Sequence, residues 1–315
     1  MFLLSIIIPA YNAGQTIAKT VESISDILFP KIEVIVVDDG STDDTPDVIN
    51  SFVARYSQIK SIRQDNAGVS VARNVGIANS QGKYLWFVDA DDTIDAKLVL
   101  SLLSKVEYAD YDFVWFANVN VFSDNHVETS HNMPEGIVEG RYTIRQWQKF
   151  YKGAGMLWQY WLKRDIVVEK KIRFVEWAKW FEDAHFLTCF SVWAKDVYIA
   201  PCSVLYYYFL NPIGAMRNSL RKERHICSVR LCIDMIERVM NFPKSVRTYV
   251  LGLQAISIAW CIREADDEYA KDLYVECKQA GVFPLSINKG SWKQKLQIVL
   301  LNWNFSMYRK FCKVL

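Results

Sequence analysis

A strict alternation of apolar runs and helical patterns over the first 95 residues most restricts the folds open to this chain. Four short apolar runs, each ended by a turn signal, are separated by three segments with apolar residues at helical spacing. The predicted strands are 3–8, 31–37, 60–64 and 84–88, and the predicted helices are 13–28, 45–56 and 69–79. This order with short connections predicts an α/β fold, a doubly wound and mostly parallel sheet with right-handed crossovers.

A polar cluster follows each predicted strand. The clusters are Tyr11-Asn12, Asp38-Asp39, Asp65-Asn66 and Asp89-Ala90-Asp91-Asp92. Because the carboxyl ends of parallel strands meet at one edge of a sheet, we expect these side chains to converge where such folds bind nucleotides. No G-x-G-x-x-G follows the first strand and no G-x-x-x-x-G-K-[ST] occurs, which disfavours ordinary dinucleotide and P-loop phosphate binding.

The segment 83–95, KYLWFVDADDTID, carries three carboxylates within four residues directly after a buried strand. These carboxylates would repel one another unless a cation or a hydrogen-bonding ligand compensates. Oxygen ligands suit Mg²⁺ or Mn²⁺, and these cations in turn suit a diphosphate. The alternative is an acidic cap on the helix predicted at 95–106.

Bulk properties indicate a globular intracellular protein. The 315 residues, 51% of them hydrophobic, allow one large domain with an extension and a substantial core. Seven scattered cysteines without a C-x-x-C pair favour reduced thiols in a cytosolic compartment. The apolar residues 1–8 are too few for a signal peptide, and no run reaches the roughly 18 apolar residues of a membrane span. We therefore expect a cytoplasmic protein, soluble or peripheral to a membrane.

Five segments in this order, SIIIPAYNAG, VIVVDDGSTDDT, NAGVSVARNVGI, GKYLWFVDADD and WFEDAHF, resemble the family 2 glycosyltransferases with a GT-A fold. The resemblance is dense over about residues 4–95 and looser over 156–219. It implies an inverting, metal-dependent enzyme that moves a sugar from a UDP-sugar to a hydroxyl of a glycan or lipid-linked glycan. It also implies a Mn²⁺ or Mg²⁺ cofactor, a role in surface polysaccharide synthesis such as O-antigen or capsule, and no nucleic-acid partner.

The resemblance assigns residues to the donor site. Pro9, Tyr11 and Asn12 would frame the nucleobase, with Tyr11 as a stacking surface. One carboxylate of Asp38 and Asp39 would accept a hydrogen bond from the uracil imide. Asn66, Gly68 and Arg73 would line the ribose and diphosphate, although a helix-surface ion pair or cap is the alternative for Arg73. Asp89 would hold the ribose or share the cation, and Asp91 would bind the cation directly. Arg217 would close over the diphosphate.

The resemblance also assigns the catalytic and acceptor side. Transfer with inversion needs one base that takes the acceptor proton. Asp183 matches the aspartate of the family's E-D element and would be this base, with Glu182 as its orienting or acceptor-binding partner. The alternative is that both acids cap the helix predicted at about 183–194. Trp158 and Trp161 would offer flat faces to acceptor sugars, with burial in the core as the alternative.

After two late strands predicted at 196–201 and 204–210, the chain changes character near residue 220. Helical patterns at about 221–241, 244–264, 267–280 and 290–311 predict a catalytic domain over 1–220 and a helical region over 221–315. No acidic residue follows Glu276, whereas seven basic residues do. The last helix is apolar nearly all round, with a stripe formed by Trp292, Leu296, Val299, Trp303 and Met307. This pattern indicates either contact with an anionic membrane, at the inner face of the cell membrane, or burial against the preceding helices.

Two other functions compete with this interpretation. A sugar-1-phosphate nucleotidyltransferase also uses a nucleotide-binding sheet of this kind, but it would need a glycine-rich basic loop after the first strand. Residues 10–16 contain neither lysine nor arginine. A non-catalytic nucleotide-sugar-binding protein is disfavoured by the retention of Asp89, Asp91 and Asp183.

Overall fold

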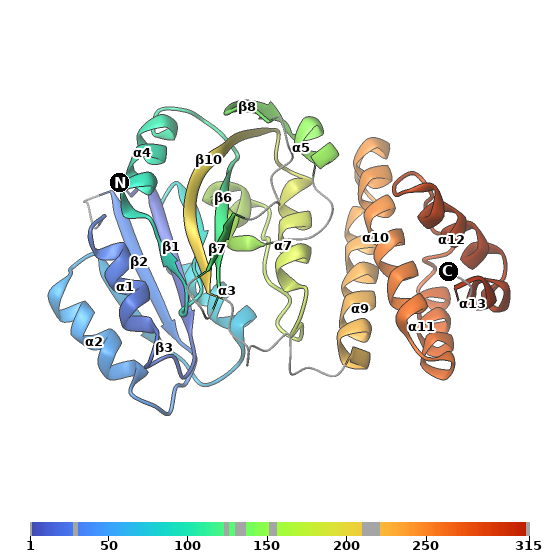
Figure 1. The fold of residues 1–315 in the computed structure, drawn as a ribbon, viewed down its shortest axis with the longest axis horizontal. Coiled ribbons are helices and arrows are strands. Elements are labelled where there is room, and N and C mark those ends of the chain that lie inside the picture. The colour runs from blue at the N-terminus through green and yellow to red at the C-terminus, as the bar shows by residue number, and fades with distance from the viewer. Residues whose placement is uncertain are drawn as a thin grey trace. The chain divides into compact units, whose positions relative to one another are not determined.

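The computed structural model describes residues 2–27, 31–122, 126–129, 137–150, 156–209 and 221–312. The chain forms two compact units, and each is discontinuous in sequence. The first unit comprises Met1–Lys179 and Trp193–Pro212, and the second comprises Trp180–Val192 and Ile213–Leu315. The described part of the first unit is a sheet with flanking helices, and that of the second unit is helical (Figure 1).

The first half of the sheet has the predicted parallel order. Strands β3, β2, β1 and β4 lie side by side in that order, and all three pairings are parallel. The strands are β1 (Leu4–Ala10), β2 (Ile32–Asp38), β3 (Ile59–Arg63) and β4 (Tyr84–Phe87), connected by α1 (Ile17–Ser25), α2 (Thr45–Arg55) and α3 (Val69–Asn79). Ala10 pairs with Asp38 in the β1–β2 register, so these two strands end at the same level.

The second half of the sheet is mixed. Strand β9 (Tyr160–Lys163) runs antiparallel between β4 and β6 (Phe113–Val121), and β6 pairs in parallel with β10 (Asp196–Phe209). The remaining elements of this unit are β5 (Thr93–Ile94), α4 (Ala96–Val106), β7 (Val127–Thr129), β8 (Gly140–Thr143), α5 (Ile144–Phe150), the 3₁₀ turn η1 (Leu157–Gln159) and α6 (Arg164–Glu169).

One long strand, β10, replaces the two late strands predicted at 196–201 and 204–210. Its pairing with β6 shifts register between Ala200 and Val204 and again between Val204 and Tyr206. Pro201 cannot donate a ladder hydrogen bond, and a bulge accommodates such a residue without ending the strand. The expected break is therefore an irregularity within one strand.

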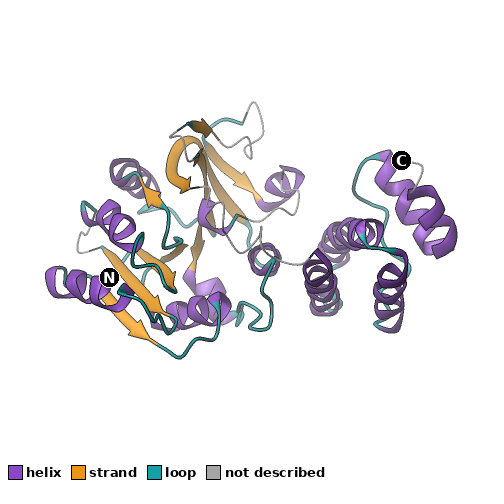
Figure 2. Ribbon diagram, turned by 60° about the horizontal axis from the view of Figure 1, so that its bottom comes forward, coloured by secondary structure: helices purple, strands orange, loops and turns teal. Residues whose placement is uncertain are grey.

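Helices cover both faces of the sheet in the first unit (Figure 2). On one face, β1 residues Ile6 and Ile8 share a buried cluster with Ile17 of α1 and Val99 of α4. On the other face, Ile35 and Val37 of β2 pack with Ala72 of α3. A Cβ at Gly76 of α3 would lie 2.3 Å from Ile7 Cγ2, so this helix can approach β1 closely only with glycine there. Strand β4 is fully buried, as predicted.

The second unit consists of helices around their own apolar core. They are α7 (Glu182–Ser191), α9 (Arg221–Val239), α10 (Lys244–Glu264), α11 (Asp267–Gln279), α12 (Trp292–Trp303) and α13 (Phe305–Cys312). The core includes Ile258, Ile262, Leu273, Ile298 and Leu301. Compactness therefore groups residues 180–192 with the helices, whereas the sequence changes character only near residue 220.

The single helix expected over 290–311 is two helices. Asn304 has an extended backbone, with φ −153° and ψ 115°. Its side-chain Oδ1 accepts a hydrogen bond of 3.0 Å from the Met307 amide. Asparagine competes with the helical ladder by bonding nearby amides in this way, which explains why α12 ends and α13 begins at this residue.

Helix α10 corrects the expectation that no segment could span a membrane. Lys244–Glu264 is long and apolar enough to do so by length and composition. Half of its most apolar window is buried inside the unit, where Ile258 and Ile262 belong to the core. The helix therefore contributes to the packing of the second unit.

Candidate active site

Several hydrogen bonds tie the loop after β1 to the residues that follow β2. The Asn12 amide donates to Ser41 Oγ (2.9 Å), and Asn12 Oδ1 accepts from the Thr42 amide (2.8 Å). The Ala13 amide donates to Thr45 Oγ1 (2.8 Å). Asn12 has φ +48°, a left-handed conformation that asparagine tolerates. These bonds fix the backbone around Tyr11, whose side chain is 52% exposed at the sheet edge.

Asp38 and Asp39 are both buried and each supports a loop. Asp38 Oδ1 accepts from the Ser41 amide (2.9 Å) and its Oδ2 from Arg63 Nη1 (2.7 Å). Asp39 reaches the loop after β3, where its Oδ1 accepts from the Ala67 amide (2.9 Å) and its Oδ2 from the Gly68 amide (2.8 Å). A carboxylate has about four lone-pair positions, so either residue retains capacity for a nucleobase N–H.

Gly40 brings the second and third loops into direct contact. It has φ +74°, and a Cβ at this position would lie 2.7 Å from the Asn66 backbone nitrogen. A residue with a side chain would be strained by the backbone conformation and would also collide with Asn66. Asn66 and Gly68 are both exposed at this edge of the sheet.

Arg73 of α3 links the third loop to the fourth. Its Nη2 donates to Asp89 Oδ1 at 3.2 Å, and its guanidinium lies 5.4 Å from the centre of the Phe174 ring. Arg73 is only 5% exposed, so the alternative of a helix-surface ion pair is wrong. The buried guanidinium therefore orients the Asp89 carboxylate through a charge-assisted hydrogen bond.

The acid cluster divides into residues with different roles. Asp92 is fully buried, and its carboxylate accepts from the Tyr206 hydroxyl (2.6 Å) and the Phe209 amide (2.7 Å). Burial and the negative charges of Asp89 and Asp91 raise the pKa of Asp92 to about 8. Asp95 caps α4 by accepting from the Leu98 amide (2.9 Å), so the helix-cap alternative applies to Asp95 and not to the cluster.

Asp89 and Asp91 are the residues of this cluster that could hold a cation. Asp91 is exposed and the side chain of Asp89 is 32% exposed. Among the residues that the structure describes, no group of three or more histidine, cysteine or acidic side chains forms a complete ligand set. Mg²⁺ commonly takes one or two carboxylates and completes its shell with substrate phosphates and water. The concentration of negative charge that raises the Asp92 pKa is what a divalent cation would offset.

Glu182 and Asp183 belong to the second unit, where they form the first turn of α7. Phe181 precedes them at the N-cap with φ +63°, and it makes no side-chain capping bond. A left-handed conformation in a bulky residue costs energy and is concentrated at functional sites. Neither acid is the N-cap residue, but both place negative charge in the first turn of the helix, where the helix dipole interacts favourably with it.

Helix α9 packs against α7 through contacts that the sequence did not indicate. His185 Nε2 lies 2.6 Å from Asp234 Oδ2, and Arg238 Nε donates to the same oxygen at 2.5 Å. Cys227 Sγ lies 3.1 Å from the Trp180 carbonyl oxygen, just before the Phe181 turn. His185 and Asp234 are 49 residues apart in the chain, and no local pattern pairs two such residues.

The acceptor assignment of two tryptophans is wrong, because both lie in the core. Trp161 has no exposed surface, and Trp158 is 6% exposed. Trp158 stacks on Tyr206 with ring centres 4.5 Å apart and on the same side contacts Tyr208. Trp177, which the sequence analysis did not single out, is 54% exposed in the segment before α7. Arg217 lies outside the described residues.

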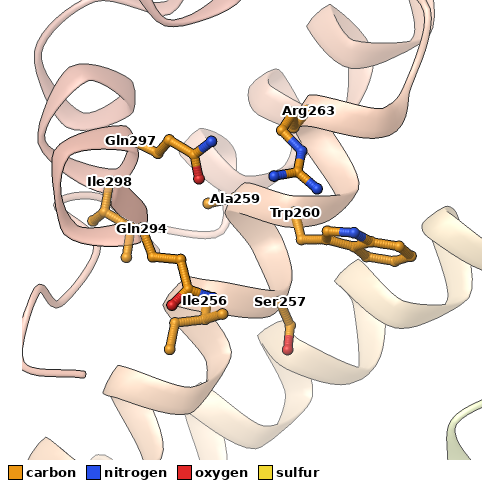
Figure 3. A pocket seen from close by; sticks show the side chains of 8 residues that line it. All are labelled: Ile256, Ser257, Ala259, Trp260, Arg263, Gln294, Gln297 and Ile298. Atoms are coloured by element: carbon orange, nitrogen blue, oxygen red, sulfur yellow. The ribbon is translucent and has the colours of Figure 1, made fainter. Parts of the chain in front are cut away.

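A cavity of about 220 Å³ lies elsewhere, between α10 and α12 of the second unit (Figure 3). Arg263 and Trp260 line it from α10, and Gln294 and Gln297 line it from α12. None of its lining residues belongs to the four sheet-edge loops or to the first turn of α7. The hydrogen bonds among the loops, and not this cavity, therefore mark the candidate active site.

The sheet order, the linked loops and the acidic fourth loop are those of a GT-A glycosyltransferase. A family model described as "Glycosyl transferase family 2" matches residues 5–181. Because this match covers more than half of the chain, the chain belongs to that family.

Particular relatives and structures resemble the chain over different lengths. It is 25% identical to the uncharacterized glycosyltransferase YibD of Escherichia coli K12, over 97% of this chain and 92% of YibD. It is 36% identical to WfaP of Escherichia coli, a UDP-Glc:alpha-D-GlcNAc-diphosphoundecaprenol beta-1,3-glucosyltransferase, over 39% of this chain and 47% of WfaP. The crystal structure of S. aureus TarS 1–349 in complex with UDP-GlcNAc has a TM-score of 0.76 at 16% identity, covering 99% of this chain and 91% of that one.

Proposed function

We propose that this chain is an inverting, metal-dependent glycosyltransferase that moves a sugar from a UDP-sugar to a hydroxyl of a glycan acceptor. The observation that carries the proposal is the linkage of four loops at one sheet edge, from Asn12–Thr42 through Asp39–Gly68 to Arg73–Asp89. Carboxyl ends of parallel strands are where such folds bind nucleotides. The donors in the name of WfaP and in the TarS complex, a UDP-glucose and UDP-GlcNAc, support a UDP-sugar.

The first three loops would hold the nucleoside. Tyr11 is exposed enough to stack on uracil, with Pro9 and Asn12 shaping the same pocket. One carboxylate of Asp38 and Asp39 would accept from the uracil imide. Asn66 and Gly68 would contact the ribose and diphosphate from the loop that Asp39 holds in place, and Arg217 would close over the diphosphate.

The fourth loop would hold the diphosphate through a divalent cation. Asp91 would bind Mn²⁺ or Mg²⁺, and Asp89, oriented by Arg73, would share it or hold the ribose. A cation held by these residues would supply positive charge that offsets the negative charge of the departing diphosphate. Asp89 and Asp91 supply hard oxygen ligands to this site, and the buried Asp92 fixes the loop through Tyr206.

Asp183 would serve as the base. Its carboxylate takes the proton of the acceptor hydroxyl while the acceptor oxygen bonds to the anomeric carbon and the bond from that carbon to the diphosphate breaks. UDP leaves from the opposite face, which inverts the configuration. Glu182 would orient Asp183 or bind the acceptor. The exposed ring of Trp177 is a better candidate than Trp158 or Trp161 for stacking on acceptor sugars.

The acceptor would be a glycan, or a glycan on a lipid carrier, in surface polysaccharide synthesis such as O-antigen or capsule. The printed name of WfaP, which acts on a diphosphoundecaprenol-linked sugar, supports a lipid-linked acceptor. An enzyme that meets such an acceptor would be cytoplasmic and peripheral at the inner face of the cell membrane.

The test is a screen of nucleotide sugars with Mn²⁺, which compares the parent with Asp183→Asn. Asp47→Asn is the matched control, because Asp47 is likewise an aspartate in the first turn of a helix, α2. We expect the parent to hydrolyse one UDP-sugar slowly and to transfer it to its acceptor. Asp183→Asn should lower transfer by about 10²–10⁴-fold, the usual contribution of a general base, whereas Asp47→Asn should not. Equal transfer by Asp183→Asn would remove Asp183 from this role.

A further inference from the structure

Helix α12 presents an apolar stripe to solvent, in addition to the apolar face that it buries. Ile298 and Leu301 are fully buried in the core of the second unit. On the other side, Trp292 is 70% exposed and Trp303 is 72% exposed, with Leu296 and Val299 between them at 37% and 44%. At 100° per residue these four side chains fall within a sector of roughly 60°, so they form one continuous stripe. Met307 of α13 is 44% exposed.

Lysines flank this stripe on both sides. Lys293 and Lys295 are exposed and, by helical geometry, lie about 100° and about 60° from Trp292 in opposite directions. Lys310 is exposed on α13. No acidic residue occurs in the sequence after Glu276, so no carboxylate of this segment opposes an anionic surface.

We propose that the face formed by Trp292, Leu296, Val299 and Trp303, with Lys293 and Lys295 beside it, docks the protein on an anionic lipid bilayer. The helix would lie in the plane of the surface. Tryptophan prefers the boundary between headgroups and acyl chains, and long lysine side chains reach from a shallowly inserted helix to the lipid phosphates. The cavity behind α12 lies on the opposite side of the helix, where Gln294 and Gln297 are among the residues that line it (Figure 3).

Charge favours a bilayer over a second copy of the chain as the occupant of this face. In a two-fold pair the same patch meets itself, so the lysines that flank one stripe would face those of the other without a carboxylate between them. Anionic headgroups would instead neutralise these lysines. The proposal rests on the peripheral location proposed above and not on the chemistry of the sheet edge, so vesicle binding and sugar transfer can fail separately.

The test is flotation of the purified full-length protein with phosphatidylglycerol–phosphatidylcholine vesicles and with phosphatidylcholine vesicles. We expect binding to the anionic vesicles only, and weaker binding as salt rises. Trp292→Ser with Trp303→Ser should abolish binding, and Lys293→Gln with Lys295→Gln should lower it by about thirtyfold. Trp193→Ser and Lys271→Gln, which change an exposed tryptophan of the first unit and an exposed lysine of α11, are the matched controls and should bind as the parent does.

Several results would overturn the proposal. These are no binding of the parent, equal binding to neutral vesicles, or full binding by the double tryptophan variant. Light scattering would give the oligomeric state of the parent and of the double tryptophan variant. A dimeric parent and a monomeric variant would show that this face mediates self-association. Both tryptophans are mostly exposed, so the thermal unfolding temperature of the double variant should match that of the parent. The double variant should also hydrolyse the UDP-sugar as the parent does, because a loss of this activity would indicate misfolding and not loss of docking.

Discussion

At the scale of single residues, the ion pair of Arg73 and Asp89 connects a buried residue of α3 to the candidate cation site. The guanidinium is buried and the carboxylate is a third exposed at the sheet edge, so the arginine comes from the core and the acid faces the site. The geometry places a fixed positive charge beneath a residue that would help to hold a cation. Removal of the arginine should therefore affect both folding and ligand binding.

Arg73→Met should lower the free energy of unfolding by about 1–3 kcal/mol, the range for losing a hydrogen bond to a charged group. Chemical denaturation measures this loss, and calorimetry with UDP and Mn²⁺ should show weaker binding because Asp89 loses its orienting partner. Arg55→Met, at an exposed position of α2, should change stability by no more than about 0.5 kcal/mol. Equal effects of the two changes would show that the Arg73 pair has no special role.

A comparison of alanine substitutions at Gly40 and Gly281 separates the cost of a left-handed backbone from the cost of a steric clash of the added Cβ. Their φ values are +74° and +70°, but only at Gly40 would a Cβ meet another atom, the Asn66 backbone nitrogen at 2.7 Å. Gly281→Ala should cost about 1–2 kcal/mol for the left-handed conformation alone. Gly40→Ala should cost more than Gly281→Ala in the same denaturation experiment and should weaken UDP binding. Equal costs would argue against close contact of the second and third loops.

At the scale of elements, the attachment of α7 to α9 is the feature that decides where the candidate base sits. Asp234 of α9 receives hydrogen bonds from His185 and Arg238, and these lower its pKa to about 2 although its partial burial opposes ionisation. The folded pKa lies below the ordinary value of about 3.9. The ionised Asp234 carboxylate therefore stabilises the fold fully above about pH 4, and this contribution is lost as the pH falls through about 2.

Asp234→Asn should lower the free energy of unfolding at pH 7 by about 1–3 kcal/mol, because the neutral amide leaves a buried partner poorly satisfied. The difference between parent and variant should shrink as the pH falls from about 4 to 2, where the Asp234 carboxylate takes up a proton. Denaturation curves across this range measure it, with Asp272→Asn at an exposed position of α11 as the control. A difference that does not depend on pH would contradict the ionised pairing.

The sequence predicted those elements whose local pattern and tertiary environment agree. Strand β4 and helix α3 have the predicted character because an uninterrupted apolar run and a clean helical stripe specify them locally. The sequence did not predict that β10 continues past Pro201, that α12 ends at Asn304, or that Trp158 stacks on Tyr206 in the core. Each of these outcomes depends on a partner far along the chain or on a single side-chain hydrogen bond, and neither leaves a periodic signal.

For the candidate site too, some features could be predicted from the sequence and others could not. Convergence of the four polar clusters could be predicted because parallel strands share an edge. The separate roles of Asp92 and Asp95 could not be predicted, because the aspartates of this segment are one residue type and differ only in burial and in hydrogen-bond partners. The link from Asp39 to the Gly68 loop was equally hidden, since it joins residues 29 apart.

At the scale of the whole molecule, the chain divides the proposed chemistry between two compact units. The first contains the loops that would hold the UDP-sugar, and the second contains the first turn of α7 and the stripe on α12. UDP binding would depend on the loops of the first unit. This division makes nucleotide binding the most direct probe of the sheet-edge site.

The decisive measurement is calorimetric titration of the full-length protein with UDP, with and without Mn²⁺. The account predicts binding that requires Mn²⁺ and that Asp91→Asn abolishes, while Asp47→Asn and Asp183→Asn leave it intact. Binding of UDP that is equally tight without the metal and unaffected by Asp91→Asn would contradict a cation held by the fourth loop. Failure to bind UDP at all, together with tight binding of a nucleoside triphosphate, would contradict the glycosyltransferase site itself.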